Sequence, residues 1–461
     1  MKSISIKKII TIVAASLCFF IAVASEPESK YKPVKSHQVS SGAFVEYRLK
    51  NNIPVYINTE VPNQVDAVYI IVKGGTMCLK PEYSGLESSL FEMMTYGSEK
   101  YPYKMIQALQ YAYQTSIGHY SLYSGSVYTL SCIDYYLDSM LPVYLDTFMN
   151  PSFDEKQFDL MKGNQLQNIT SSKNDPQRIL FNQIYKQLYK NSPLLTSSSV
   201  KEESYKNITI LNLKKHHKKI LDASRISIVA VGKYDIESFL SKLDESVGTL
   251  KSSKFKEVPQ KESKLNIENE KVVLTHKDAT GSEMAVRVFQ SPSVLSDDYV
   301  TGQIVSDIFS TTMFNIIREK YGACYTPASQ IDSSFNPIGI DYGMKVSDME
   351  NFEKYYEECV QLMLEGKVIS SVEGENAVYD TIENVLQGYK NSYITKKYTS
   401  QSTSSGIASR VAASILQFGD LTTADKIPGR ALNVTGEDIH RVFKKYWVDG
   451  KSQWFVMKGE N

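Results

Sequence analysis

Residues 85–102 decide the fold, and they read GLESSLFEMMTYGSEKYP. The spacing of apolar residues predicts a helix over Ser84–Met94, and Gly97 and Pro102 break the pattern after it. A second helix fits Tyr103–Gln114. Runs rich in β-formers predict strands on either side, at 55–57, 67–73 and 122–130. Strands and helices therefore mix around this stretch, which indicates an α/β (α+β) fold.

Further out, the chain divides into two halves of roughly 200 residues, 42–250 and 266–461. Residues 251–265 are dominated by Lys, Ser, Glu, Gln and Pro, a composition typical of a linker. Before it we expect helices at 135–149 and from 154 onward, and a buried strand at 226–231. Beyond it the order partly repeats, with strands at 272–274 and 284–290, a helix at 296–320 and a strand at 338–345.

The N-terminus predicts export. Lysines at positions 2, 7 and 8 precede the mostly apolar run Ile9–Val23, and Ala22-Val23-Ala24 has the small-x-small form of a cleavage site. Residues 1–24 are therefore predicted to be a signal peptide and 25–41 a polar leader. The run is shorter than the roughly 20 residues of a spanning helix. We expect a periplasmic or secreted protein, with membrane association through an uncleaved signal as the alternative.

Charge and histidine content limit the possible chemistry. The 461 residues carry 51 basic and 51 acidic side chains, a balance that argues against nucleic acid as a partner. His119 stands alone among Ile-Gly-His-Tyr-Ser, which indicates a structural histidine. His216 and His217 lie among four lysines, which predicts a solvated face. Any histidine-based site must draw on six residues: His37, His119, His216, His217, His276 and His440.

Four cysteines remain after the predicted cleavage: Cys78, Cys132, Cys324 and Cys359. They are far apart in the sequence, and a domain of this size does not need disulfides. We expect free buried thiols, although three pairings of four cysteines are possible and the sequence does not choose among them.

The opening stretch resembles the active-site helix of the pitrilysin/insulinase family of zinc peptidases, which includes the mitochondrial processing peptidases. There G-L-A-H-x-L-E-H-M is followed by G-[ST]-x-K-Y-P, and a motif like Phe153-Asp154-Glu155 precedes the next helix. The matching residues are Gly85, Leu86, Met93, Gly97, Ser98, Lys100, Tyr101 and Pro102. The resemblance covers about residues 40–460. It implies two homologous metallopeptidase-like halves, each a mainly antiparallel sheet packed with helices.

The family needs H-x-x-E-H because histidines at i and i+4 share one helix face and bind one zinc ion. The Glu activates the bound water, and a Glu on a later helix is the third ligand. Here Ser88 and Glu92 stand at the histidine positions and Phe91 at the base position. Asn168 falls at the third-ligand position, give or take one residue, and its neighbours Gln165, Gln167 and Ile169 are not acidic either. The resemblance therefore implies a degenerate zinc site, with neither catalytic residues nor metal in this chain.

The second half keeps a different motif. Residues 318–325, REKYGACY, resemble the family's R-E-x-x-G-L-A-Y, with Arg318, Glu319, Gly322 and Tyr325 matching. In the family this Arg and Tyr reach the substrate, and a guanidinium and a phenol can hydrogen-bond a peptide carbonyl as it becomes an oxyanion. The resemblance implies that Arg318 and Tyr325 bind substrate. A plain helix end capped by Gly322 is the alternative interpretation.

Three functions remain open. The leading hypothesis is a non-catalytic subunit that pairs as a heterodimer with a zinc-bearing homologue and forms half of a chamber for unfolded peptide. The second is a structural or peptide-binding member of the family, like the core subunits of respiratory complexes. The third is an atypical active zinc endopeptidase that uses Glu92 and His119, for which the missing base would cost about 10²–10⁴-fold in rate.

Overall fold

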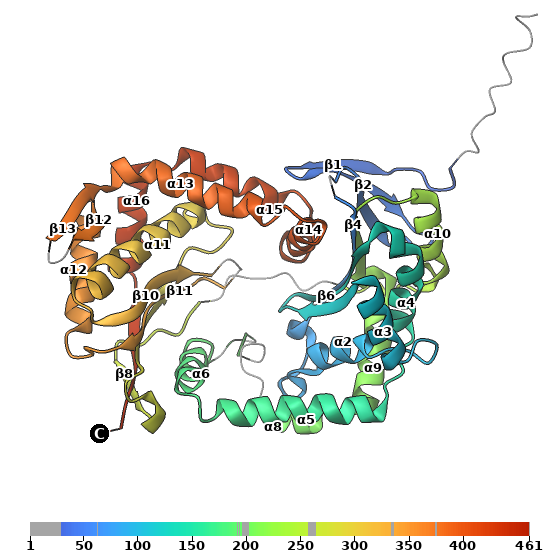
Figure 1. The fold of residues 1–461 in the computed structure, drawn as a ribbon, viewed down its shortest axis with the longest axis horizontal. Helices are drawn as coiled ribbons and strands as arrows, with labels where there is room; N and C mark the ends of the chain where they lie inside the picture. Colours follow the sequence, from blue (N-terminus) through green and yellow to red (C-terminus); the bar gives the residue numbers. More distant parts are fainter. Residues whose placement is uncertain are drawn as a thin grey trace, which may run out of the picture.

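The computed structural model describes residues 29–61, 63–190, 192, 194–195, 202–256, 264–332, 336–373 and 376–460. The predicted signal peptide lies outside these ranges, as do residues 25–28 of the leader and 257–263 of the predicted linker. Within the described ranges, no helix is both long enough and apolar enough to cross a bilayer. Figure 1 shows the N-terminal half on the right and the C-terminal half on the left.

The first sheet has seven strands in the order β1-β2-β3-β7-β4-β6-β5. Neighbours run antiparallel except β3 and β7, which are parallel. The predicted strand at 122–130 begins later, because residues 122–124 form the turn that joins β6 to the unpredicted strand β5. The strands are β1 (Lys35–Val39), β2 (Gly42–Arg48), β3 (Pro54–Asn58), β4 (Val65–Lys73), β5 (Ser116–Ser121), β6 (Gly125–Ile133) and β7 (Ile226–Val231).

The helices of this half include the one predicted from the opening stretch, α2, and the long α5 that follows Phe153-Asp154-Glu155. Asp154 caps α5 by accepting a hydrogen bond from the Gln157 N–H, as its position before the helix predicts. The helices are α2 (Leu86–Thr95), α3 (Tyr103–Tyr113), α4 (Leu137–Met149), α5 (Glu155–Ser172), α6 (Pro176–Leu188), α8 (Glu202–Asn207), α9 (Ile210–Ile220) and α10 (Ile236–Glu245).

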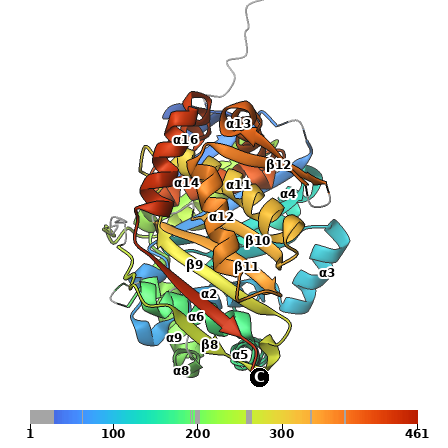
Figure 2. The ribbon, with the colours of Figure 1, turned by 90° about the vertical axis from the view of Figure 1, so that its left-hand side faces the viewer.

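The second half contains a five-stranded sheet in the order β10-β11-β9-β14-β8 and a separate hairpin, β12-β13. Figure 2 shows β14, the last strand of the chain, running between β9 and β8. Only β14 and β8 are parallel. The strands are β8 (Val272–Thr275), β9 (Glu283–Gln290), β10 (Cys324–Ile331), β11 (Ile338–Val346), β12 (Lys367–Glu373), β13 (Asn376–Thr381) and β14 (Ser452–Lys458).

Its first helix departs from the sequence prediction, since the predicted helix at 296–320 starts at Tyr299 and changes to a π-helix at Phe314. The helices are α11 (Tyr299–Met313), the π-helical η7 (Phe314–Lys320), α12 (Phe352–Leu364), α13 (Ile382–Thr399), α14 (Ser404–Phe418), α15 (Thr423–Lys426), α16 (Gly436–Phe443) and η9 (Lys444–Val448). Both halves are mixed α/β with mainly antiparallel sheets, as predicted.

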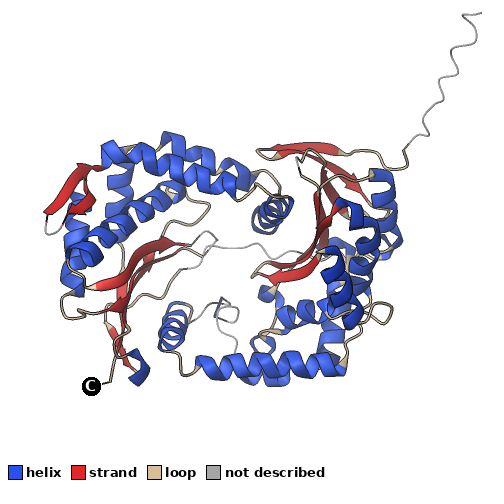
Figure 3. Ribbon diagram, viewed as in Figure 1, coloured by secondary structure: helices blue, strands red, loops and turns tan. Residues whose placement is uncertain are grey.

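Each sheet is covered on one face by a helix from the other half, an arrangement that no local sequence pattern predicts. Helix α14 packs on β4 and β7, where Tyr69 and Ile71 meet Val411 and Ile415. Helix α6 packs on the second sheet, with Leu180, Ile184 and Leu188 against Val286, Val288 and Phe455. In Figure 3 each sheet lies between the helices of its own half and this single exchanged helix. We refer to α6 and α14 as the exchanged helices.

The exchange explains why the central strands read as continuous apolar runs. In β4, Val68, Ile70 and Val72 belong to the core shared with α2 and α4, whereas Tyr69 and Ile71 point to the opposite face, against α14. A strand whose two faces are both buried needs apolar residues at every position. All six residues of β7 are buried for the same reason.

Candidate functional site

Gly85 directly precedes helix α2 and has a left-handed backbone with φ of 89°. A Cβ at this position would lie 2.9 Å from the ring of Tyr205. Glycine therefore fits here on two grounds, the backbone angle and the space. The helix packs against β5, α9 and α5, with Phe91 against His119 of β5 and Glu92 against Gln165 of α5. Ser88 is half-buried.

Phe91 stands where the family motif has its general base, and its side chain is part of the hydrophobic core. Phe91 is completely buried, and its ring centroid lies 6.4 Å from those of His119 and Tyr128. A phenyl ring has no lone pair to accept a proton, so this position has no means of activating water.

The carboxylate of Glu92 is held by neutral donors. Tyr96 Oη donates to Glu92 Oε1 at 2.8 Å, and Gln165 Nε2 donates to Glu92 Oε2 at 2.8 Å. Tyr205 Oη in turn donates to Gln165 Oε1 at 2.9 Å. Burial, together with the hydrogen bond to Glu92, raises the pKa of Tyr96, so this phenol keeps its proton and remains a donor. The network therefore engages both oxygens of the one carboxylate that the degenerate motif retains.

The residue of α5 that meets Glu92 is Gln165 and not Asn168, which is exposed. The expected third-ligand position thus lies one helical turn away from the contact. Phe158 and Met161 mark the buried face of α5, and Gln165 falls seven residues after Phe158, on that same face. This spacing is the signal that could have identified Gln165 from the sequence.

The two residues of the atypical-peptidase hypothesis, His119 and Glu92, have different partners: His119 packs on Phe91, and Glu92 is bonded by Tyr96 and Gln165. Burial lowers the pKa of His119, while the charge of Glu92 acts in the opposite direction. Within the described residues, however, no three His, Cys, Asp or Glu side chains form a group able to hold a metal ion. A hydroxyl, a phenyl ring, an amide and one hydrogen-bonded carboxylate are a donor set that does not fit catalytic zinc.

The predicted solvated face at His216 and His217 is wrong. Both side chains are buried, and each has a specific partner. His217 Nε2 lies 2.8 Å from the carbonyl oxygen of Phe148, and His216 Nε2 forms a short contact with Glu87 of α2. Leu213 and Ile220 flank the pair at helical spacing, so the lysines occupy only the opposite face of α9.

Glu87 is a completely buried carboxylate, and Ser126 Oγ donates to its Oε1 at 2.8 Å. Burial by itself would raise the pKa of Glu87, but the hydrogen bond and charge of His216, with the bond from Ser126, outweigh it and lower the pKa. A buried, partnered carboxylate one position before Ser88 therefore fixes α2 against α9 and β6.

Acid should unfold the protein partly through this group. Because the folded-state pKa of Glu87 is lowered, its contribution is complete above the ordinary carboxyl pKa and is lost as pH falls through the lowered value. We expect Glu87→Gln to be less stable than the wild type at pH 7 and to lose less stability between pH 5 and 3. Urea unfolding at each pH measures this, with Glu82→Gln, an exposed neighbour, as the matched control. Equal pH slopes for Glu87→Gln and the wild type would contradict the assignment.

In the other half, the half-buried Arg318 and the exposed Tyr325 form a pair. Arg318 Nη1 donates to the Tyr325 carbonyl oxygen at 3.0 Å, and its guanidinium lies 4.6 Å from the Tyr325 ring centroid. Lys345 lies 5.5 Å from the same centroid. The Tyr325 residue is 59% exposed. Cation–π contacts of this kind hold the ring in place while the phenol faces solvent.

Gly322 makes this pairing possible. Its φ of 59° is left-handed, and its N–H donates to the Arg318 carbonyl oxygen at 2.9 Å, which ends the helix. The chain then turns directly into β10 at Cys324, so Tyr325 returns to the side of Arg318. The helix-end interpretation and the pairing of the two side chains therefore both hold.

The four cysteines are free thiols, as expected, although only three of them are buried. Cys132, Cys324 and Cys359 are buried, and Cys78 is exposed. Burial raises the pKa of Cys324 to about 11, so this thiol beside Tyr325 keeps its proton at neutral pH.

Family models match most of the described chain. The model described as insulinase (peptidase family M16) matches residues 55–199, and the one described as peptidase M16 inactive domain matches residues 207–366. A relative described as an uncharacterized zinc protease, from Rickettsia felis, is 22% identical over 305 residues, which cover 64% of this chain and 71% of the relative.

Solved structures share the fold. A protease from Helicobacter pylori has a TM-score of 0.74 and 15% identity, covering 93% of this chain and 100% of that one. A peptidase M16 inactive domain from Pseudomonas fluorescens has a TM-score of 0.75 and 14% identity, covering 91% and 98%. The periplasmic protease PqqL from Escherichia coli has a TM-score of 0.75 and 11% identity. It covers 100% of this chain, which spans 51% of PqqL.

Proposed function

Because the chain belongs to the insulinase-like family of peptidases, we propose that it is a non-catalytic subunit that pairs with a zinc-bearing homologue. The observation that carries the proposal is the contrast between its two halves. At the metal position, Phe91 is buried in the core and Glu92 is bonded by Gln165 and Tyr96. At the second motif, the exposed Tyr325 and the half-buried Arg318 stay paired.

In the proposed complex the partner supplies zinc and the activated water, and this chain supplies substrate contacts. The N–H groups of Arg318 and the hydroxyl of Tyr325 hydrogen-bond a carbonyl oxygen of an unfolded peptide, most strongly when that oxygen gains negative charge. The guanidinium of Arg318 already donates from Nη1 to the Tyr325 carbonyl oxygen and pairs through Nε with Glu319 at 3.3 Å, which leaves Nη2 for the substrate. This cation suits an oxygen that carries charge, because charge-assisted hydrogen bonds are the stronger kind.

The predicted signal peptide supports a further part of the proposal, that the complex works after export in the periplasm or outside the cell.

The first test is metal and activity analysis of the purified chain. We expect no stoichiometric zinc by mass spectrometry and no hydrolysis of unfolded peptides, because the donor set lacks both histidines and the base. Co-expression with a zinc-bearing homologue from the same organism should yield a stable heterodimer that hydrolyses peptide. A chain that binds one zinc ion and cleaves peptides alone would instead establish the atypical active peptidase.

A designed variant serves as the positive control for metal binding. Ser88→His, Glu92→His and Gln165→Glu together place two histidines at i and i+4 and a carboxylate on α5 at the residue that contacts position 92. This triple variant should bind zinc. The matched variant with Asn168→Glu in place of Gln165→Glu should bind it more weakly, because residue 168 is exposed and residue 165 faces α2.

The structural or peptide-binding alternative predicts a different outcome. Under it no zinc peptidase co-purifies, and changing Arg318 leaves function unaltered.

A further inference from the structure

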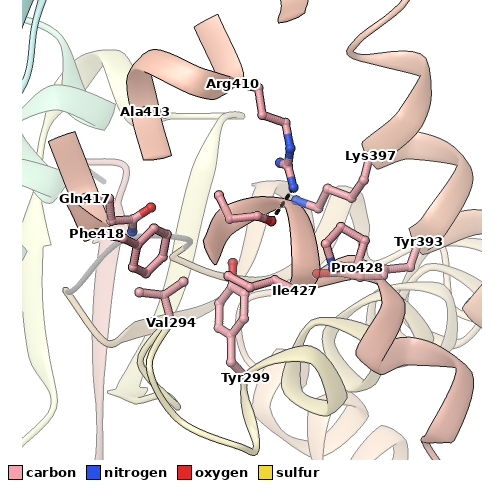
Figure 4. A pocket seen from close by; sticks show the side chains of 11 residues that line it. Val294, Tyr299, Tyr393, Lys397, Arg410, Ala413, Gln417, Phe418, Ile427 and Pro428 are labelled. Atoms are coloured by element: carbon pink, nitrogen blue, oxygen red, sulfur yellow. Dashed lines mark hydrogen bonds between the residues drawn. The ribbon is translucent and has the colours of Figure 1, made fainter. Parts of the chain in front are cut away.

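A small cavity of about 160 Å³ lies where the chain passes from α13 into the exchanged helix α14. Its polar walls are Tyr299 of α11, Tyr393 and Lys397 of α13, and Arg410 and Gln417 of α14. Figure 4 shows the Lys397 amine and the Arg410 guanidinium pointing into the same space. The remaining walls are mostly apolar, with Val294, Ile427 and Pro428 among them.

The cavity brings two cations together without a carboxylate among its lining residues. Burial lowers the pKa of Lys397, and the charge of Arg410 lowers it further. Asp307 acts on Lys397 in the opposite direction, but it pairs with Lys396 at 3.1 Å and does not line the cavity. Two neighbouring positive charges in a partly enclosed space repel each other unless an anion lies between them.

Two buried polar atoms of the cavity lack hydrogen-bond partners among the described residues. They are the hydroxyl of Tyr393, a residue only 3% exposed, and Nε of Arg410. Arg410 Nη2 is occupied, since it donates to the Ala424 carbonyl oxygen at 2.6 Å. A buried donor left without a partner costs free energy comparable to a lost hydrogen bond. Tyr299 Oη accepts from Gln303 at 3.2 Å, so its own proton remains available.

We propose that this cavity is a binding site for a small oxyanion, a phosphate or a carboxylate, held by Lys397, Arg410 and the hydroxyls of Tyr299 and Tyr393. Such an anion supplies the missing negative charge and accepts from both unpartnered donors at once. The volume suits this class, since it holds several water molecules but not a large organic ligand. A cation does not fit between Lys397 and Arg410, and an apolar ligand would leave the donors unsatisfied.

Occupancy would stiffen the connection between the two halves. Arg410 belongs to α14, which also contacts the first sheet: Tyr69 Oη donates to the Ser405 carbonyl oxygen at 3.3 Å, and Ser404 Oγ donates to Asn63 Oδ1 at 3.0 Å. An anion that ties Arg410 to Lys397 and Tyr393 fixes α14 to the rest of the C-terminal half. The site is independent of the proposed peptidase-subunit role, so either proposal can fail without the other.

The test uses the whole purified chain, titrated with inorganic phosphate and, in a second arm, with acetate. Sodium chloride at equal ionic strength is the reference for both. We expect saturable binding of at least one anion by calorimetry and a higher melting temperature in its presence, because a ligand of the folded state stabilises it. The anion that binds more tightly, phosphate or acetate, identifies the preferred class of ligand. If neither anion differs from chloride, the proposal is overturned.

Variants locate the binding. Arg410→Met or Lys397→Met should weaken anion affinity about 10–100-fold, since each removes a charge-assisted hydrogen bond. Without anion, Lys397→Met should melt higher than the wild type, because it removes the repulsion from Arg410. Tyr393→Phe should weaken binding without lowering the melting temperature of the anion-free protein.

Lys426→Met changes an exposed lysine beside the cavity and should behave as the wild type. Equal anion affinity in Lys397→Met and Lys426→Met would also overturn the site.

Discussion

In a heterodimer reconstituted with a zinc-bearing homologue, Arg318→Ala is expected to lower kcat for peptide hydrolysis by about 10²–10³-fold. This is the size of effect expected when a single donor to a developing oxyanion is removed. Tyr325→Phe keeps the ring and its cation–π contact with Arg318 but removes the hydroxyl, so the loss should be smaller, about tenfold. Steady-state kinetics of both variants, with binding of the partner measured separately, provide the readout.

Because Arg318 also contacts Tyr325, two further variants separate direct from indirect effects. Arg318→Lys keeps a positive charge near the ring but lacks the planar fork, and it should lose most of kcat if the fork binds the substrate. Lys345→Ala removes the other cation over Tyr325 and should keep turnover near that of the wild type. If Arg318→Ala hydrolyses peptide as fast as the wild type, the proposed substrate contact is wrong and the structural alternative gains support.

The largest expected effect on stability is at Arg287. This buried residue of β9 pairs through Nη1 with Asp341 of β11 at 3.2 Å and donates from Nη2 to the Trp447 carbonyl oxygen at 2.6 Å. Asp341 is completely buried and also accepts from Tyr356 Oη at 2.7 Å. Arg287→Leu leaves this carboxylate without its counter-charge and should lower the free energy of unfolding by about 3–5 kcal/mol.

Denaturant unfolding, followed by tryptophan fluorescence, measures this loss. Since burial already raises the pKa of Asp341 and Arg287 opposes that rise, Arg287→Leu should raise the pKa further. The double variant with Asp341→Asn removes the unpaired charge and should recover part of the stability.

Lys367→Met breaks an exposed ion pair with Glu365 in the same half and should lower the free energy of unfolding by about 1 kcal/mol or less. A similar cost for Arg287→Leu and Lys367→Met would show that the buried pair contributes little.

Local patterns predicted the elements but not which surfaces meet. The apolar run 226–231 indicated a buried strand, and β7 spans the same six residues. In contrast, Leu180, Ile184 and Leu188 show only that one face of α6 is apolar, and no local pattern tells that this face packs on the second sheet. Packing between segments far apart in the sequence depends on the whole chain, which is why the exchanged helices were missed.

The candidate site also shows that local patterns predict where residues lie on a helix better than what those residues contact. Motif spacing placed Ser88, Phe91 and Glu92 on α2, where they lie. Four lysines around His216 and His217 outweighed the weaker signal of Leu213 and Ile220, so the buried face of α9 was interpreted as solvated. Charge density describes the outer face of an amphipathic helix and carries no information about the inner one.

The exchanged helices also set an order of events during synthesis. The first sheet has all its strands once Val231 has been made, but α14, which covers its second face, begins at Ser404, 173 residues later (404 − 231). At about 5–20 residues per second, translation takes about 9–35 s to supply that helix. During this interval Tyr69, Ile71 and their neighbours have no native cover, so a nascent N-terminal half that has formed its sheet exposes one apolar face until the ribosome has nearly finished.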